Sequence, residues 1–161
     1  MNKGTTLIEI IFYITISGVI FLASFSALHT LTQSKVQNQV NSELGYQGNI
    51  IMNQILETIR ESDSVINPSI QENSNLLSLE KDENEINYEL SENNILISRG
   101  ISEPTALNNS KVQVIDLSFY NYSSSINHDS IRVMFTLQYT EQAGNNHQRQ
   151  FYGTASIRQE K

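Results

Sequence analysis

The amino-acid sequence predicts an α+β fold, in which a long N-terminal α-helix packs on antiparallel β-sheet. Residues 7–28 form an apolar run that holds a single charged side chain, Glu9. Residues 34–66 continue with apolar side chains at helical spacing, and no proline occurs before Pro68. Residues 76–157 then alternate apolar and polar side chains, which is typical of strands with one buried face. A chain of 161 residues leaves room for a single soluble domain beside the helix.

The apolar run is long enough to cross a membrane. At ~1.5 Å per helical residue, residues 5–31 exceed the ~30 Å of a hydrocarbon core. Lys3 precedes the run and the next basic residue is Lys35, which orients the N-terminus inward and the following domain outward. A carboxylate inside such a span costs about 2.5–3.5 kcal/mol on insertion scales. Glu9 is therefore expected to have a functional partner.

The first residues of the chain carry a processing motif. Lys3 and Gly4 precede the apolar segment, and Glu9 stands at the fifth position after the glycine. This arrangement resembles the N-terminus of type IV pilins and of type II secretion pseudopilins. The resemblance implies that a prepilin peptidase cuts after Gly4, that the new N-terminal residue Thr5 is methylated, and that Glu9 acts in assembly. The family usually has phenylalanine at the position of Thr5.

Two other interpretations of the N-terminus stay open. A cleaved secretory signal peptide could use residues 24–26 as a small-residue cleavage site. However, the apolar region of such a peptide has about 7–15 residues, and here it would contain Glu9. A plain signal anchor would hold Glu9 without a use for it. The length of the run and the position of Glu9 favour the pilin-type interpretation.

Residues 34–66 predict an amphipathic helix that continues the span. Its apolar side chains share one face and are Leu44, Ile51, Met52, Ile55, Leu56 and Ile59. Pro68 is expected to end the helix, because the residue before a proline is pushed out of helical geometry. Gly18 predicts a close contact between membrane helices. The resemblance to pilins offers the alternative that the helix unwinds locally here, although the proline usual in that family is missing. Gly45 and Gly48 interrupt the second half, and each costs about 0.8–1.0 kcal/mol relative to alanine.

The segment after Pro68 predicts two groups of antiparallel strands. The expected strands are residues 76–80, 86–90 and 95–99, followed by 112–122, 131–140 and 150–157. Ile115 is placed among the core-facing residues of its strand. Residues 101–110 contain Pro104 and an Asn-Asn-Ser cluster, which predict a linker or surface loop. Residues 142–147 contain Gly-Asn-Asn and predict the hairpin that joins the last two strands.

The expected organisation is a leader peptide at residues 1–4, a membrane-spanning and filament-core helix at 5–31, and a soluble domain at 32–161. The helix lying on antiparallel strands also resembles the globular domain of pilins. The helix end around Met52 and a last strand ending near Arg158 look most like the J-type pseudopilins and the W-type minor pilins. Many large pilins close their C-terminal region with a disulfide, whereas this chain has no cysteine.

The sequence holds no convergent catalytic or metal-binding set. The three histidines lack the spacing of a metal-binding pair: His29 ends the span, and the other two, His128 and His147, fall in predicted loops. Residues 82–85, Asp-Glu-Asn-Glu, offer oxygen ligands for calcium but are more typical of a solvated hairpin tip. We therefore predict no enzymatic activity, no cofactor and no metal site.

The charge distribution argues against nucleic-acid binding, since the net charge is −7 and the ten Lys and Arg residues are scattered. The predicted function is a structural minor pilin or pseudopilin of a type IV filament machine, such as a pilus, a type II secretion system or a competence pseudopilus. The expected partners are other pilin or pseudopilin subunits, the prepilin peptidase and the inner membrane. The chain would be single-pass in that membrane and then enter a pilus or pseudopilus at the cell surface. The alternatives are a membrane-anchored binding module or adhesin, and an anchored enzyme.

Overall fold

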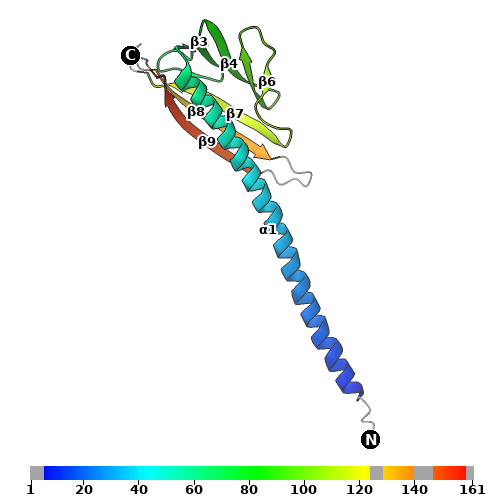
Figure 1. Ribbon diagram of the computed structural model, residues 1–161. Coiled ribbons are helices and arrows are strands. Elements are labelled where there is room, and N and C mark those ends of the chain that lie inside the picture. The colour runs from blue at the N-terminus through cyan, green and yellow to red at the C-terminus, as the bar shows by residue number, and fades with distance from the viewer. Residues whose placement is uncertain (1–5, 124–128, 140–146, 159–161) are drawn as a thin grey trace. The chain divides into compact units, whose positions relative to one another are not determined.

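The computed structural model describes residues 6–123, 129–139 and 147–158. One long helix, α1, runs over Leu7–Glu61 (Figure 1). The strands that follow it are β1 (Ser64–Asn67), β2 (Asn73–Ser74), β3 (Leu77–Lys81), β4 (Asn84–Ser91), β5 (Asn94–Arg99), β6 (Thr105–Ala106), β7 (Val112–Asn121), β8 (Ser130–Tyr139) and β9 (His147–Ser156). The chain divides into two compact units, Met1–Gln39 and Val40–Lys161.

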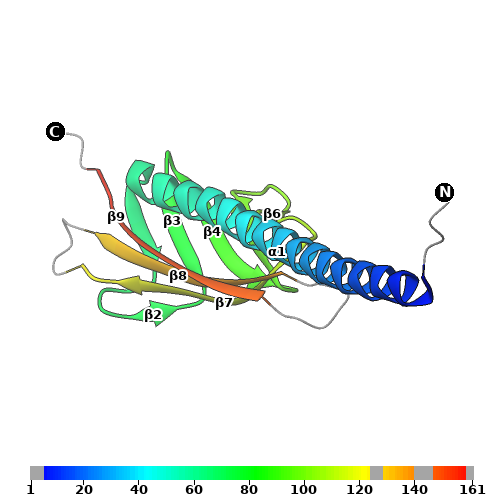
Figure 2. The same cartoon turned by 90° about the horizontal axis from the view of Figure 1, so that it is seen from below.

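The strands form two antiparallel sheets within the second unit. The first sheet has the order β1-β3-β4-β5-β6 and the second the order β2-β7-β8-β9. The two hairpins β3-β4 and β4-β5 build the middle of the first sheet, and β7, β8 and β9 form a meander in the second. The last part of α1 lies over both sheets (Figure 2). The predicted α+β class, a long N-terminal helix on antiparallel sheets as in pilin-like folds, is confirmed.

The first unit contains the apolar part of α1. Every described side chain between Thr6 and Gln39 is exposed, including the large apolar ones such as Leu7, Phe21 and Leu31. This part of α1 is long and apolar enough to cross a membrane. An exposed apolar surface of this extent is unfavourable in water, so this half of the helix is compatible with a transmembrane anchor.

The second unit buries the predicted stripe of α1 against both sheets. All six predicted members are buried, and Val40 and Gly48 extend the stripe at its start. The inner faces of the strands supply the rest of the core: Leu77, Leu79, Ile86, Tyr88, Ile95 and Ile97 from the first sheet, and Val112, Val114, Leu117, Phe119, Ile131, Val133, Phe135, Leu137, Phe151 and Ala155 from the second. Because α1 touches both sheets, its stripe joins them into one core.

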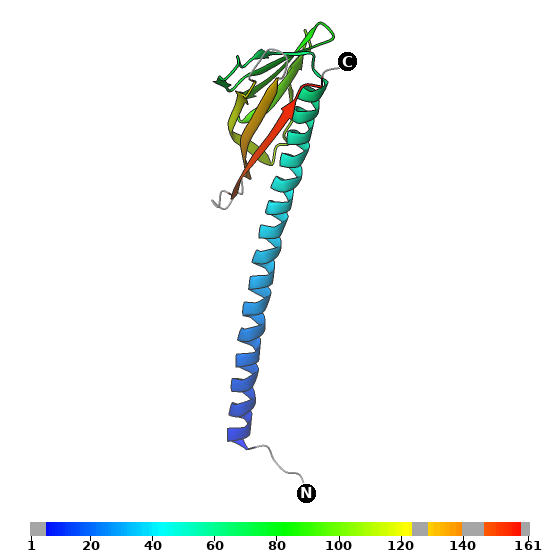
Figure 3. The same cartoon turned by 90° about the vertical axis from the view of Figure 1, so that its left-hand side faces the viewer.

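Glycine allows α1 and β9 to approach closely. A Cβ atom on Gly48 would collide with the ring of Phe151 on β9. A Cβ atom on Gly153 would lie 2.7 Å from Met52 Sδ and 3.0 Å from Leu56 Cδ1 on α1. At Gly48 the backbone therefore needs a residue without a side chain, whereas at Gly153 a side chain would displace the flexible ends of Met52 and Leu56. Figure 3 shows β9 lying along this part of the helix. Gly48 lowers the helix propensity of this turn, but it leaves the space that the Phe151 ring occupies.

The helix ends at Glu61, so the predicted continuation to residue 66 is wrong. The Ser62 hydroxyl donates a 2.6 Å hydrogen bond to the carbonyl oxygen of Thr58, and the Asp63 N–H then donates to Glu80 O at 2.8 Å in the neighbouring strand. The Ser62 bond is an i−4 hydroxyl contact that also occurs inside α1. It is the pairing of the Asp63 N–H with Glu80 O that takes the backbone out of the helix. The chain enters β1 before Pro68 can act.

Three further details of the strand region differ from the prediction. Ile115 is 40% exposed, because the pairing of β7 with β8 shifts register between Val114 and Asp116. Such a bulge turns one residue out of the alternation. The predicted loop at residues 101–110 contains the short strand β6 and the buried Asn108. The short strand β2, which pairs with β7, was also not predicted.

The β3-β4 and β4-β5 hairpin tips are tight turns built without glycine. Lys81 pairs with Asn84 across one tip, and the two residues between them, Asp82 and Glu83, have φ of 51° and 61°. The tip between β4 and β5 repeats this arrangement with Glu92 and Asn93, at φ of 48° and 63°. Two central residues with positive φ are typical of a type I′ turn. Residues 82–85 are thus a hairpin tip, as the sequence favoured. The predicted hairpin at residues 142–147 lies, apart from His147, outside the described residues.

Candidate functional site

Glu9 lies in the first turn of α1. Its backbone N–H donates to the carbonyl oxygen of Thr6 at 3.0 Å, and its side chain is exposed. No described cation forms an ion pair with it, and its neighbours Leu7, Ile8 and Ile10 are exposed apolar residues. The other predicted processing residues, Gly4 and Thr5, lie outside the described residues. The carboxylate of Glu9 is thus placed on an apolar helix surface, where an external cation would be its natural partner.

Hydroxyl groups along the apolar half of α1 are bonded within the helix. The Thr15 hydroxyl donates to Ile11 O at 2.7 Å, that of Ser24 to Ile20 O at 2.8 Å, and that of Thr30 to Ser26 O at 3.0 Å. At the far end, the side chains of His29 and Gln33 lie 3.0 Å apart. Hydroxyls satisfied by their own helix cost little in an apolar environment. Glu9 is then the one charged side chain on this surface, among the described residues 6–34.

A polar groove of about 1010 Å³ lies at the end of α1, within the second unit. Three segments form it: the last helical turns, the tip of the β3-β4 hairpin and the chain just after β9. Its lining residues are Asn53, Glu57, Arg60, Glu61, Ser62, Asp63, Lys81, Asp82, Ile157 and Arg158. Two hydrogen bonds hold these segments together: the Arg158 N–H donates to Arg60 O at 3.1 Å, and the Asp82 N–H donates to the side-chain Oδ2 of Asp63 at 2.9 Å.

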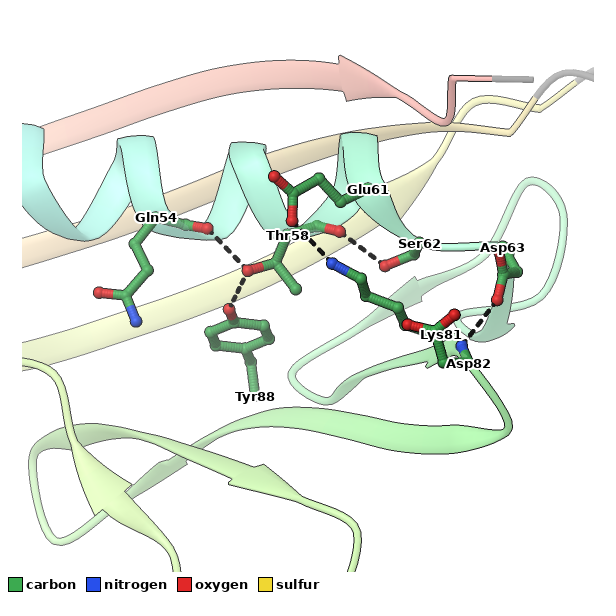
Figure 4. A network of polar contacts seen from close by, with 8 residues as sticks. All are labelled: Gln54, Thr58, Glu61, Ser62, Asp63, Lys81, Asp82 and Tyr88. Atoms are coloured by element: carbon green, nitrogen blue, oxygen red, sulfur yellow. Dashed lines mark hydrogen bonds and ion pairs between the residues drawn. The ribbon is translucent and has the colours of Figure 1, made fainter. Parts of the chain in front are cut away.

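One ion pair spans the groove (Figure 4). Lys81 Nζ lies 2.8 Å from Glu61 Oε2, and both side chains are accessible to solvent. The hydrogen bond from Lys81 lowers the pKa of Glu61, and the same contact raises the pKa of Lys81. Exposed pairs of this kind contribute little to stability. The described guanidinium groups of Arg60 and Arg158 form no ion pair with any described carboxylate.

A buried hydrogen-bonded chain links α1 to β4 of the first sheet. The Tyr88 hydroxyl donates to Thr58 Oγ1 at 2.8 Å, and Thr58 Oγ1 donates in turn to Gln54 O at 2.9 Å (Figure 4). Burial raises the pKa of Tyr88, and the hydrogen bond to Thr58 opposes this shift only in part. The contact fixes the first sheet against α1, and the phenol is not accessible as a nucleophile or base.

The groove offers charged and hydrogen-bonding side chains but no set of metal ligands among the described residues. Among the described residues, no group of three or more His, Cys, Asp or Glu side chains could hold a metal ion. His147 begins β9 and does not lie in a loop as predicted, while His128 lies outside the described residues. The calcium interpretation of residues 82–85 gains no support, because Asp82 and Glu83 are consecutive turn residues at a solvated tip.

The predicted site residue Glu9 and the groove, which the sequence did not reveal, belong to different units of the chain. Glu9 belongs to the first unit, whereas Arg60, Lys81 and Arg158 come together in the second from distant positions of the chain. A periodic pattern cannot reveal such a cluster, because its members come from a helix end, a hairpin tip and a strand end. No protein-family model, no curated protein and no solved structure matches this chain.

Proposed function

We propose that the chain is a structural minor pilin or pseudopilin subunit of a type IV filament machine. The observation that carries this proposal is the exposed apolar half of α1, whose single charged side chain in the described part is Glu9. The motif from Lys3 to Glu9 supports it, since it resembles the prepilin cleavage site. The α+β domain on the same helix agrees with the architecture of that family.

In this function Glu9 serves assembly. Cleavage after Gly4 would create an amine on Thr5, and a helix carries Glu9 about 6 Å along its axis from Thr5 at ~1.5 Å per residue. A neighbouring helix shifted by roughly that distance would bring its amine beside the carboxylate. Repetition of this head-to-tail contact builds an open filament. It also offsets the cost of burying either charge alone.

Mass spectrometry of the N-terminus tests the processing step. Protein purified from cells that contain the prepilin peptidase should begin at Thr5, with or without an added methyl group. Protein from cells without the peptidase should retain residues 1–4. A chain that keeps Met1, or loses only Met1, in both strains would contradict the proposal and favour a simple membrane anchor.

Glu9→Gln tests the assembly step, because it keeps the shape of the side chain and removes its charge. Membrane insertion and cleavage should stay normal, whereas co-purification with partner subunits should fall well below the wild-type yield. Glu89→Gln, which changes an exposed glutamate on β4, is the matched control and should co-purify normally. Normal co-purification of processed Glu9→Gln protein would show that this carboxylate has no role in assembly.

The proposed subunit is a low-copy one. Its domain carries two sheets with many Asn and Ser residues and no disulfide, which suits a tip or initiating position better than a closely repeated shaft. Quantitative proteomics of sheared filaments should therefore find it far below the main subunit. A comparable stoichiometry would contradict this position.

The polar groove favours one alternative, a membrane-anchored binding module. Such a module would need the second unit and an anchor, and it would not need cleavage at Gly4. N-terminal mass spectrometry therefore separates the two functions.

A further inference from the structure

The two sheets end in four edge strands of very different length. In the described chain, β2 and β6 have two residues each, and β1 has four and a register shift. The fourth edge, β9, has ten residues, and its pairing with β8 runs without a shift from Ser156 to His147. Proteins protect sheet edges with short strands, bulges, proline or lysine. β9 has none of these features.

Every second residue of β9 directs its backbone away from β8. The Ile157 N–H donates to Asp129 O at 3.0 Å, so odd-numbered residues bond to β8. In an antiparallel pair this alternation continues along the strand. The even-numbered residues therefore present free N–H and C=O groups at the edge: Gln148, Gln150, Tyr152, Thr154 and Ser156. No described residue hydrogen-bonds to these backbone groups.

The side chains at these positions do not cover the edge. All five are exposed, all are uncharged, and Tyr152 is 81% exposed. The odd-numbered residues on the other face pack against α1, as Phe151 and Gly153 do. β9 is thus anchored on the helix through one face and on β8 through one edge, and its second edge remains open in the described structure.

A basic side chain lies near the start of this open edge. The guanidinium of Arg149 is 5.3 Å from the centre of the Phe151 ring. At the other end the chain turns toward α1, where the Arg158 N–H donates to Arg60 O at 3.1 Å. Residues 147–158 contain no Asp or Glu, although the net charge of the chain is −7. The strand itself is therefore basic within an acidic molecule. Carboxylates gather at its end, where Glu57, Glu61 and Asp63 line the groove beside Arg158. The start of the edge, at Arg149, thus favours a partner with a carboxylate.

We propose that β9 accepts an extended, acidic segment of a neighbouring subunit as an added strand. Backbone hydrogen bonds to the even-numbered residues would supply the pairing. A carboxylate on the partner would lie beside Arg149. Only the identity of the partner as a filament subunit rests on the proposed function; strand addition itself does not depend on Glu9 or on cleavage.

Peptide binding to the full-length protein in detergent tests the proposal. The probe is a fluorescent ten-residue peptide of alternating Thr and Val with a glutamate near each end, and its counterpart carries lysines instead. The acidic peptide should raise the anisotropy at concentrations roughly tenfold or more below those needed for the lysine peptide. Equal binding of both peptides, or of neither, would overturn the proposal.

A proline at position 154 tests the edge itself. Thr154→Pro removes an N–H that points away from β8, so no bond within the sheet is lost, and proline is tolerated on edge strands for this reason. It should abolish binding of the acidic peptide, whereas Thr154→Ala should bind it as the wild type does. Binding retained by a folded Thr154→Pro protein would show that the peptide uses another surface.

Charge removal provides an independent variant in case the proline protein does not fold. Arg149→Gln should reduce the preference for the acidic peptide over the lysine peptide to near one. An unchanged preference would contradict the proposal. If peptide binding behaves as expected while Glu9→Gln protein still co-purifies normally, strand addition stands and the filament role of Glu9 fails. If the acidic peptide does not bind while Glu9→Gln protein fails to co-purify, strand addition fails and the filament role of Glu9 stands.

Discussion

The Tyr88 hydroxyl donates a 2.8 Å hydrogen bond to Thr58 Oγ1, and this bond links β4 of the first sheet to α1. Both residues are buried, with Tyr88 at 0% and Thr58 at 8% exposure. The Thr58 hydroxyl in turn donates a hydrogen bond to Gln54 O within the helix. The helix thus holds the first sheet by a directional contact as well as by apolar packing.

The two partners of this bond should respond differently to substitution. Tyr88→Phe leaves Thr58 bonded to Gln54 and should cost about 0.5–1.5 kcal/mol. Thr58→Val keeps the shape of the side chain but leaves the Tyr88 hydroxyl without its acceptor, which should cost about 1–3 kcal/mol. We therefore expect Thr58→Val to have a lower melting temperature than Tyr88→Phe. Thermal unfolding of the full-length proteins in detergent, monitored by circular dichroism, measures this difference. The opposite order would show that the phenol finds another partner.

Tyr88 should also make the fold sensitive to alkaline pH. Its pKa in the folded protein lies above the ordinary value of 10.0, so the folded state holds the phenolic proton more tightly than the unfolded state does. This contribution is complete below the unfolded pKa and is lost as pH rises toward the folded pKa. Lys81, whose pKa is also raised, acts in the same direction but is exposed.

The melting temperature of the wild type should accordingly fall more steeply above pH 10 than that of Tyr88→Phe. Tyr152→Phe, which changes an exposed ring, is the control and should follow the wild-type curve. Parallel curves for the wild type and Tyr88→Phe would mean that other groups govern alkaline unfolding.

Gly48→Ala should destabilise the second unit despite a better helix propensity. The gain in propensity is about 0.8–1.0 kcal/mol, whereas the new Cβ collides with Phe151 and overpacking costs typically 1–3 kcal/mol. Gly18→Ala offers a matched control, since nothing within 4 Å would meet its Cβ. The Gly48 variant should melt at a lower temperature than the Gly18 variant. Equal melting temperatures would show that β9 moves away from α1 without cost.

Ile55→Ala should be among the most damaging truncations of the helix. Ile55 is 0% exposed in the centre of the core, and such a truncation costs about 2–5 kcal/mol. Ile50→Ala, at a 40% exposed position of the same helix, removes the same atoms and should change the melting temperature little. If both variants melt alike in detergent, the stripe faces something other than the sheets.

Local patterns were sufficient to predict the helix stripe and six of the strands. The side chains from Leu44 to Ile59 repeat at 3.6-residue spacing, and strands such as β8 alternate over their full length. Each of these patterns arises because one face of the element is buried in the core, and such a pattern can be recognised within the element itself. The predicted end of α1 was wrong because it relied on Pro68. The helix ends earlier, where the Asp63 N–H pairs with Glu80 O of β3.

Features that depend on pairing between distant segments could not be predicted. The bulge that exposes Ile115 is defined by its register against β8, and β2 exists only through its pairing with β7. Likewise, Arg60 and Arg158 are far apart in sequence and meet only because β9 lies along α1. For the candidate site, the sequence indicated Glu9 but could not indicate the groove or the open edge.

The two hairpin tips also bear on how this domain can change over evolution. Each tip holds two non-glycine residues in a left-handed conformation, which costs of order 1–3 kcal/mol per residue unless the surroundings compensate. A glutamate codon becomes a glycine codon by one base change, so Glu83→Gly or Glu92→Gly would relieve this strain in a single step. The chain therefore carries a reserve of stability at surfaces remote from its core. That reserve could compensate for destabilising changes elsewhere, including those that remodel the edge of β9 for a new partner.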